Sequence, residues 1–356
     1  MRYSTLGIGL ALTVSLFLTS VNHGRPFFFL AEAQDDEDLS LCGFHRIKKF
    51  DTNGKLITSW GDKGTGNGQF IHPHGIAVDS KGNVFVTDEE RQDVQKFDSN
   101  GTFLAKWGSP GRGEGQFSSR IEDINVDSND NVYVVDYGNN RVQKFTNTGE
   151  FITMWGSRGS EPGQFDRPWG VTFDSNGDVY VSDLRNNRIQ KFDANGNFLS
   201  EWGSEGNGPG EFIHLHGIAI DSDDNVYVTD ARENSRISKF SNDGEFTTMW
   251  GSMGSELGQF IEHHGIDFDS AGHVYVVDTA NQRIQVFTPD GRFMSSWGEM
   301  GAGNEQFLMP QDIAIDSDNI YISDVGDAHP EISYIERALN ENQALTQESC
   351  DDDLEE

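Results

Sequence analysis

Histidines concentrate at one recurring place in this 356-residue chain, which we call the entrance position. Three of them stand there, each immediately before a glycine that opens an apolar segment: His74, His216 and His264. Three more lie one or two residues upstream: His72, His214 and His263. Three neutral imidazoles with an open fourth position form the ligand set of a catalytic zinc site. The chain therefore has the residues for a zinc centre, provided that its fold brings them together.

Other copies of the entrance position hold Glu122, Trp169 and Gln311. Glu122 or Gln311 could orient a histidine ligand or complete the coordination of a metal. An alternative needs no metal, since each histidine can hydrogen-bond a neighbouring backbone carbonyl while ordered water fills the remaining space. Both interpretations remain open on the sequence.

A second variable position lies four residues before an arginine that recurs along the chain. It holds Tyr137 and Arg232 in two copies, and Arg185 stands one residue further along in another. Together with the histidines, these side chains would form a bowl of phenol, guanidinium and imidazole groups. The alternative is that exposed loop Arg and Tyr side chains have no function.

An internal repeat must position these residues. Trp-Gly recurs at spacings of 47 or 48 residues: Trp60, Trp107, Trp155, Trp202, Trp250 and Trp297. Each pair precedes a glycine-rich stretch and then short segments in which apolar and polar residues alternate, which is typical of half-buried strands. Four such strands in each unit predict one blade of a β-propeller.

The ends of the repeat region predict how the ring closes. The region begins with a third and a fourth strand at residues 46–50 and 56–60, and it ends with a first and a second strand at 313–316 and 320–324. These halves complete each other. We therefore predict an all-β, six-bladed β-propeller of four-stranded antiparallel blades, closed by a two-plus-two clasp of N- and C-terminal strands. The Asp that ends each second strand is expected to cap a turn by accepting backbone N–H groups.

The repeat resembles the NHL family, whose pattern contains Pro-x-Gly-Ile-Ala-Val-Asp, Gly-Asn-Val-Tyr-Val-x-Asp, Asn-Asn-Arg-Ile-Gln-Lys-Phe and a closing Trp-Gly. Residues 167–174 and 187–192 nearly reproduce this pattern, and the similarity covers residues 43 to about 325. The resemblance implies a six-bladed propeller. It implies no particular function, because propellers host many unrelated activities.

The entrance histidines are also similar to those of the peptidyl-α-hydroxyglycine lyase family, which cleaves a carbon–nitrogen bond in peptide amidation. That family holds zinc with histidines in Pro-His-Gly-type first strands; His74 matches the motif, and His216 and His264 match it without the proline. The resemblance implies Tyr137 as general base and Arg232 as a clamp on the substrate carboxylate. The chain departs from the family in that its histidines do not come from alternating blades, and Arg232 is one blade out of place.

A binding function requires fewer residues. The histidines, Trp169 and Tyr137 at one mouth of the channel could bind a peptide, a glycan or a partner protein, with polar contacts from Glu122, Arg185 and Gln311. We expect a ligand- or protein-binding module, with a zinc-dependent lyase or hydrolase as the alternative.

The charge of the chain disfavours nucleic acid as a partner. The sequence has 58 acidic against 26 basic residues, a formal net charge of −32, and no run of Lys or Arg longer than two. Nucleic-acid binding depends on Lys and Arg at phosphates, and anionic membrane surfaces are disfavoured for the same reason.

The N-terminus is expected to direct export. Residues 1–33 contain an apolar stretch at 6–21 and a small-x-small pattern at 31–33, as in a secretory signal peptide; left uncleaved, the segment would be an anchor. An acidic linker is predicted at 34–42, the propeller at 43–326 and an acidic tail at 327–356. In a secreted or extracytoplasmic protein, Cys42 and Cys350 could form a disulfide near the clasp.

Overall fold

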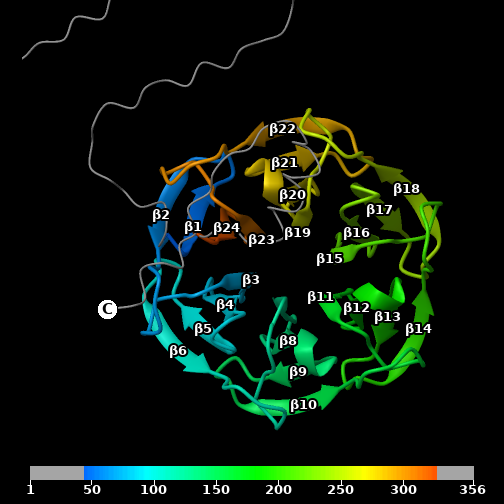
Figure 1. Ribbon diagram of the computed structural model, residues 1–356, viewed down its shortest axis with the longest axis horizontal. Coiled ribbons are helices and arrows are strands. Elements are labelled where there is room, and N and C mark those ends of the chain that lie inside the picture. The colour runs from blue at the N-terminus through cyan, green and yellow to red at the C-terminus, as the bar shows by residue number, and fades with distance from the viewer. Residues whose placement is uncertain (1–43, 327–356) are drawn as a thin grey trace, which may run out of the picture. The chain divides into compact units, whose positions relative to one another are not determined.

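The computed structural model describes residues 44–326, which form a closed ring of six β-sheets (Figure 1). The predicted all-β, six-bladed propeller is confirmed. The predicted signal segment, linker and tail, and the Cys42–Cys350 pair, lie outside the described residues. Within residues 44–326, no helix has the length and apolar character needed to cross a membrane.

Each sheet is one blade of four antiparallel strands, and in blades 1 to 5 the strands follow chain order outward from the channel. Blade 1 consists of β3 (Pro73–Val78), β4 (Val84–Asp88), β5 (Asp93–Phe97) and β6 (Phe103–Trp107). Blade 2 consists of β7 (Ile124–Val126), β8 (Val132–Asp136), β9 (Arg141–Phe145) and β10 (Phe151–Trp155). Blade 3 consists of β11 (Pro168–Phe173), β12 (Val179–Asp183), β13 (Arg188–Phe192) and β14 (Phe198–Trp202).

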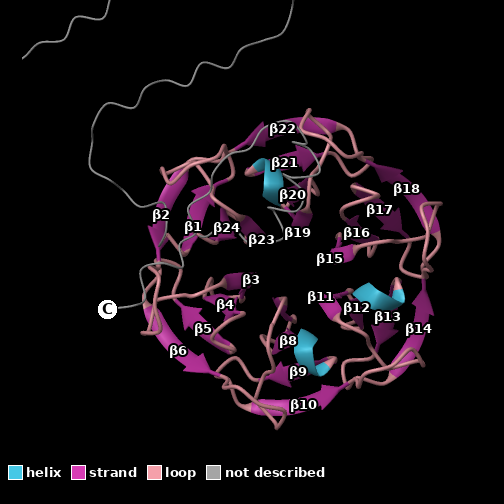
Figure 2. Ribbon diagram, in the orientation of Figure 1, coloured by secondary structure: helices cyan, strands magenta, loops and turns pink. Residues whose placement is uncertain are grey.

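Blades 4 and 5 repeat this order. Blade 4 consists of β15 (Leu215–Ile220), β16 (Val226–Asp230), β17 (Arg236–Phe240) and β18 (Phe246–Trp250). Blade 5 consists of β19 (His263–Phe268), β20 (Val274–Asp278), β21 (Arg283–Phe287) and β22 (Phe293–Trp297). The helices of the described chain are three single 3₁₀ turns after second strands (Figure 2): η1 (Tyr137–Asn139), η2 (Leu184–Asn186) and η3 (Thr279–Asn281).

Blade 6 joins the two ends of the repeat region. Its strands are β1 (Arg46–Asp51), β2 (Leu56–Trp60), β23 (Pro310–Ile315) and β24 (Asn319–Asp324), in the order β2-β1-β24-β23. β1 pairs with β24 without interruption from Arg46 opposite Asp324 to Asp51 opposite Asn319. A buried ion pair of 2.9 Å between Lys48 Nζ and Asp324 Oδ2 also links the two strands. The predicted two-plus-two clasp is thus present.

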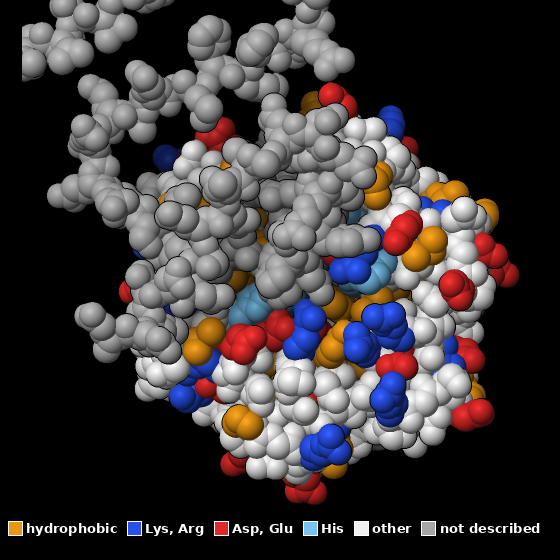
Figure 3. All heavy atoms as spheres, viewed as in Figure 1, with side chains coloured by type: hydrophobic (Ala, Val, Ile, Leu, Met, Phe, Trp, Pro, Cys, Tyr) orange, Lys and Arg blue, Asp and Glu red, His pale blue; other side chains and the backbone are white. Residues whose placement is uncertain are grey.

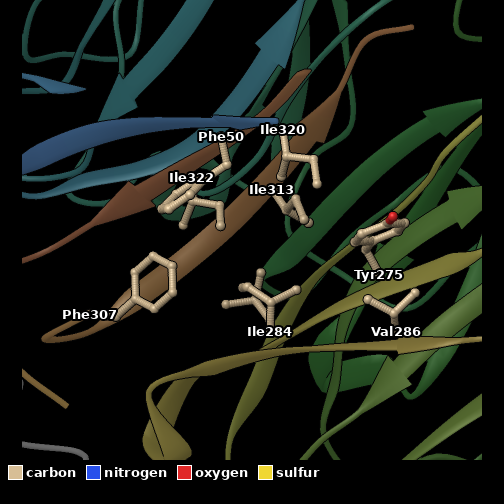
Figure 4. Close-up of a cluster of buried hydrophobic side chains, with 9 residues drawn as sticks. Phe50, Tyr275, Ile284, Val286, Phe307, Ile313, Ile320 and Ile322 are labelled. Atoms are coloured by element: carbon tan, nitrogen blue, oxygen red, sulfur yellow. The ribbon is translucent and has the colours of Figure 1, made fainter. Parts of the chain in front are cut away.

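Apolar side chains fill the spaces between neighbouring blades. Figure 4 shows the cluster between blades 5 and 6, which includes Phe50, Tyr275, Ile284 and Ile322, each at most 5% exposed. The second strands of blades 1 to 5 are buried at every residue because they pack on both faces, whereas outer strands such as β6 alternate between half-buried and exposed. Packing between blades therefore supplies most of the core.

The Trp-Gly repeat holds adjacent blades together. Trp60 of blade 6 covers Gly101 in a turn of blade 1, where φ is +84° and a Cβ atom would lie 2.5 Å from the indole ring. Gly61 has φ of +103°, and a Cβ atom there would lie 2.7 Å from the ring of Phe70. Because side chains at either glycine would collide, the repeat needs glycine at both places.

The strand-ending aspartates cap turns, as expected. Asp183 accepts hydrogen bonds from the backbone N–H of Asp166 (2.8 Å), from Nδ2 of Asn186 (2.8 Å) and from Nε of Arg188 (2.9 Å). The equivalent aspartates of the other blades also accept backbone N–H groups: Asp88, Asp136, Asp230, Asp278 and Asp324. These carboxylates are structural.

Candidate functional site

The ring carries all six entrance residues to one end of the central channel, the mouth. Five of them are the second residues of the innermost strands β3, β11, β15, β19 and β23, and the sixth precedes β7. All are at most 9% exposed: His74, Glu122, Trp169, His216, His264 and Gln311. Figure 3 shows histidine side chains near the centre of this face, with Lys and Arg side chains close by.

The entrance side chains contact one another around the channel axis. The rings of Trp169 and His216 stack with centroids 4.1 Å apart, and His216 meets His264 at 4.7 Å. His264 Nδ1 lies 2.8 Å from Oε1 of Gln311. The His74 ring lies further away, 6.1 Å from His264 and 5.6 Å from Trp169. The mouth is thus a packed layer rather than an open pore.

Both ring nitrogens of His74 lie close to Glu122. Its Nδ1 is 3.1 Å from the Glu122 carbonyl oxygen, and its Nε2 is 3.4 Å from the Glu122 carboxylate. Burial, with help from the charges of His264 and His72, holds the pKa of His74 well below its usual range. At this residue, the structure shows the carbonyl-bonded histidine that the sequence left open as an alternative.

Another group at the mouth offers closely spaced metal donors. One ligand atom from each of His214, His216 and Glu262 lies within 4.8 Å of the others, which no other trio of His, Cys, Asp or Glu in residues 44–326 achieves. Burial lowers the pKa of His214 to about 4 and that of His216 well below its usual range. Burial alone would raise the pKa of Glu262, but the neighbouring His264 and Arg232 side chains lower it to about 2. Neutral imidazoles and an ionised carboxylate are the forms that bind metals.

Tyr137 and three arginines form a pocket beside the mouth. The cavity of about 390 Å³ is lined by Arg120, Tyr137, Arg158, Asp166 and Arg167, among others. The guanidinium groups of Arg120 and Arg167 lie 5.3 and 5.6 Å from the centre of the Tyr137 ring. Burial, followed by the Glu122 charge, raises the pKa of Tyr137, so the phenol is protonated at neutral pH and can donate a hydrogen bond.

Several charged residues at the mouth have left-handed backbone conformations. The φ angles are +91° at Arg120, +60° at Arg167 and +49° at Glu262, all two residues before an entrance residue, and +52° at Arg232. Residues with side chains rarely adopt this region, and such strain clusters at functional sites. The conformation therefore marks these loops as functional candidates.

The channel behind the mouth contains carboxylates. A cavity of about 200 Å³ is lined by Asp123, Asp267 and Asp312, together with Ile and Ala side chains. Asp267 Oδ2 accepts the N–H of Ile315 in the next blade (2.7 Å), and Asp312 and Asp123 bridge blades in the same way. Burial raises the pKa of Asp267 to about 7 and that of Asp312 to about 6.

Comparison with known families agrees with this architecture. The NHL repeat model matches residues 70–97 and 119–145, and the model of a six-bladed β-propeller family, DUF5128, matches residues 170–250 and 260–329. The chain is an NHL-repeat six-bladed propeller. No curated protein matches it.

Solved structures share the fold of this NHL propeller at low sequence identity. A virginiamycin B lyase from Staphylococcus aureus is 17% identical, with a TM-score of 0.54 over 79% of this chain and 82% of that one. A protein of unknown function from Bacteroides thetaiotaomicron is 17% identical, with a TM-score of 0.56 over 78% and 76%. A gluconolactonase from Xanthomonas campestris is 12% identical, with a TM-score of 0.52 over 72% and 86%. At these identities, the likeness shows the fold alone.

The NHL propeller brings together most of the residues singled out in the sequence. The six entrance residues share the mouth, Tyr137 lies beside Trp169 with ring centroids 6.0 Å apart, and Arg232 Nε lies 3.0 Å from Oε1 of Glu262. Arg185 is exposed and lines a neighbouring pocket of about 270 Å³ with His214. The closest donor trio includes His216 but neither His74 nor His264.

Other residues of the mouth were not predicted from the sequence. Arg120, Arg167 and Glu262 share with His214 the position two residues before the entrance residue, so comparing that column across blades would have found them. Asp123 and Asp312 replace the glycine that follows the entrance residue in the other blades. This change from glycine to aspartate in two blades can be recognised in the sequence and could have pointed to the channel carboxylates.

Proposed function

We propose that this NHL propeller is a binding module for carboxylate-bearing ligands, peptides among them, which dock at the mouth against Tyr137 and its arginines. The observation that carries the proposal is the pocket of about 390 Å³ that Arg120, Arg158 and Arg167 line together with Tyr137. Such a group of guanidiniums is notable in a chain of formal charge −32. Guanidinium groups bind carboxylates through paired hydrogen bonds, and a protonated phenol can add another.

The three arginines of the pocket differ in how closely they already pair with carboxylates, and this difference selects the residue to test. Arg120 already pairs with Glu89 and with Glu122, the latter at 3.0 Å. Arg158 is 4.0 Å from Asp166 and its side chain is 78% exposed. Arg167 is exposed, and no carboxylate of the described chain forms an ion pair with it. Its guanidinium is therefore the best placed to receive an incoming carboxylate.

The test compares matched peptides and matched variants. N-acetylated tripeptides with a free C-terminal carboxylate are titrated into the full chain by calorimetry, alongside the same peptides with a C-terminal amide. We expect the carboxylate forms to bind more tightly, and Arg167→Gln to weaken them about 10-fold or more, as loss of a charge-assisted contact does.

Arg292→Gln is the matched control, because Arg292 is exposed as Arg167 is but lies in a hairpin turn and pairs with Asp290. Equal binding of carboxylate and amide peptides, or equal losses in the two variants, would contradict the proposal.

We also propose that the chain is exported, on the strength of the apolar segment at residues 6–21. A mature N-terminus near Gln34, measured by mass spectrometry, tests that step.

One observation favours a second candidate, a metal-dependent lyase or hydrolase. The rings of His216 and His264 lie 4.7 Å apart at the same mouth as Tyr137 and Arg232, as a zinc centre with Tyr137 as base and Arg232 as clamp would require. Cleavage of a peptidyl-α-hydroxyglycine by the zinc-supplied chain, lost in Tyr137→Phe, would select this function over binding alone.

A further inference from the structure

His216 is a buried polar side chain whose hydrogen-bonding capacity is unused. It is 1% exposed, and neither Nδ1 nor Nε2 has a hydrogen-bond partner within residues 44–326. Buried polar groups in proteins nearly always have a partner. Stacking on Trp169 at 4.1 Å covers a face of the ring but leaves both nitrogens, which lie in the ring plane, to other partners.

The neighbours of His216 supply further atoms that can bind a metal. The His214 ring lies 4.6 Å from the His216 ring, at an angle of 80°. The Glu262 carboxylate completes the trio within 4.8 Å. Whichever tautomer a neutral imidazole adopts, one of its ring nitrogens presents a lone pair, so these rings and the carboxylate can offer ligand atoms to one cation.

His264 adds a fourth donor on the same side. Its Nδ1 pairs with the side-chain oxygen of Gln311 at 2.8 Å, so Nδ1 carries the proton and the neutral ring presents a lone pair at Nε2. That Nε2 has no hydrogen-bond partner in the described chain and lies 4.0 Å from Oε1 of Glu262. Gln311 thus orients His264 as outer partners of metal ligands commonly do.

Glu262 is held in place from its other side. Arg232 Nε lies 3.0 Å from Oε1 and 3.3 Å from Oε2 of the carboxylate. The backbone of Glu262 is left-handed, with φ of +49°. The contacts with Arg232 and the left-handed backbone together hold the Glu262 carboxylate close to the histidines.

We propose that His214, His216 and Glu262 bind one divalent transition metal of the zinc class, with His264 as the nearest fourth ligand. Two histidines and a glutamate are an established zinc ligand set. Tetrahedral zinc with bonds of about 2.0–2.2 Å holds its donors about 3.3–3.6 Å apart, so the widest separation in the trio, within 4.8 Å, closes by about 1 Å or slightly more on binding. This site differs from a centre at His74, because His74 is bonded to Glu122 through both ring nitrogens. It does not rest on the proposed binding of carboxylates at Arg167.

The test titrates cobalt(II), and zinc in competition, into the full chain after removal of metals with a chelator. We expect one equivalent to bind, with the visible absorption of a four-coordinate site and without the near-ultraviolet thiolate band that Cys42 or Cys350 would produce. His214→Gln, His216→Gln and Glu262→Gln should each weaken binding about 100-fold or more. Gln311→Leu should weaken it about 10-fold, as outer-partner substitutions do.

His74→Gln is the decisive control, since it removes an entrance histidine but no ligand of this site; His273→Gln removes a histidine elsewhere, where it pairs with Asp269 at 2.8 Å. Both should bind metal within 3-fold of the parent chain. Thermal unfolding in chelator shows whether each variant folds. If a histidine variant does not fold, Glu262→Gln still tests the site, because glutamine retains the shape of the glutamate side chain. No saturable binding, or a loss in His74→Gln equal to that in His214→Gln, overturns the proposal.

Discussion

Two neighbouring positions in each repeat decide what the mouth can bind. The entrance residue lies at the start of the innermost strand, and the residue two before it lies in the preceding loop, so both columns lie at the mouth end of the blades. In blades 4 and 5, these columns place His214, His216 and Glu262 together. In blades 2 and 3, they place Arg120 and Arg167 around Tyr137 instead. The same scaffold therefore presents two chemistries side by side.

Asp267 makes the free energy of unfolding of the chain depend on pH. Burial raises its pKa to about 7, whereas a carboxyl in an unfolded chain has a pKa near 4. The folded state binds this proton more tightly, so the stabilisation is complete below about pH 4 and is lost as the pH rises to about 7. We expect the difference in unfolding free energy between the parent chain and Asp267→Asn to fall by about 1–2 kcal/mol over that range, because channel water weakens the effect.

Urea unfolding at a series of pH values measures this difference. Asparagine is a reasonable replacement because Asn125 occupies the same position in blade 2, where its Nδ2 donates to the Val171 carbonyl (3.0 Å). Titration of the histidines cancels between the two chains. A difference that does not change with pH would show that Asp267 ionises normally.

Blades 2 to 6 are each stabilised as an element by a buried charge pair at the end of the second strand. In blade 3, Arg188 contacts Asp183 and also donates to the carbonyls of Ser160 and Gln164, at 2.8 Å each, which ties the glycine-rich loop to the sheet. Related arginines serve blades 2, 4 and 5: Arg141, Arg236 and Arg283. The recurring Asp and Arg are therefore explained by the blade and not by chemistry at the mouth.

Asp183→Asn should destabilise the chain by about 2–3 kcal/mol, because it removes the buried charge partner of Arg188 and leaves only the partly exposed Glu201, at 2.8 Å from Nη1. Chemical denaturation measures the change. Asp290→Asn is the comparison, since the Asp290–Arg292 pair is exposed and should contribute less than about 1 kcal/mol. Equal effects would mean that burial of the pair is unimportant.

The whole ring depends on the clasp in blade 6. β1 and β24 come from opposite ends of the repeat region, and their backbone pairing closes the last blade. Without β1 and β2, β24 would present an unpaired edge and blade 6 would lose half of its core. The ends also lie close together, since a Cβ atom at Gly326 would be 2.6 Å from the backbone nitrogen of Phe44.

Deleting residues 44–60 should therefore prevent formation of a stable monomer, with aggregation seen by light scattering and size-exclusion chromatography. A circular permutant that starts at Gly61 and joins Gly326 to Phe44 through a short linker should fold with a melting temperature close to that of the parent chain. A deletion variant that remains monomeric and melts like the parent would show that the clasp is dispensable.

The amino-acid sequence by itself determined the number of blades, the strands of each, the clasp and the gathering of entrance residues at one mouth. The prediction succeeded because residues that recur in all six copies are those that every blade requires for packing, as the contact between Trp60 and Gly101 shows. Only the tertiary structure decided which side chains meet. His74 turns to Glu122, while His216 faces His214 and Glu262, and this choice depends on spacings of a few ångströms across blades that no repeat period encodes.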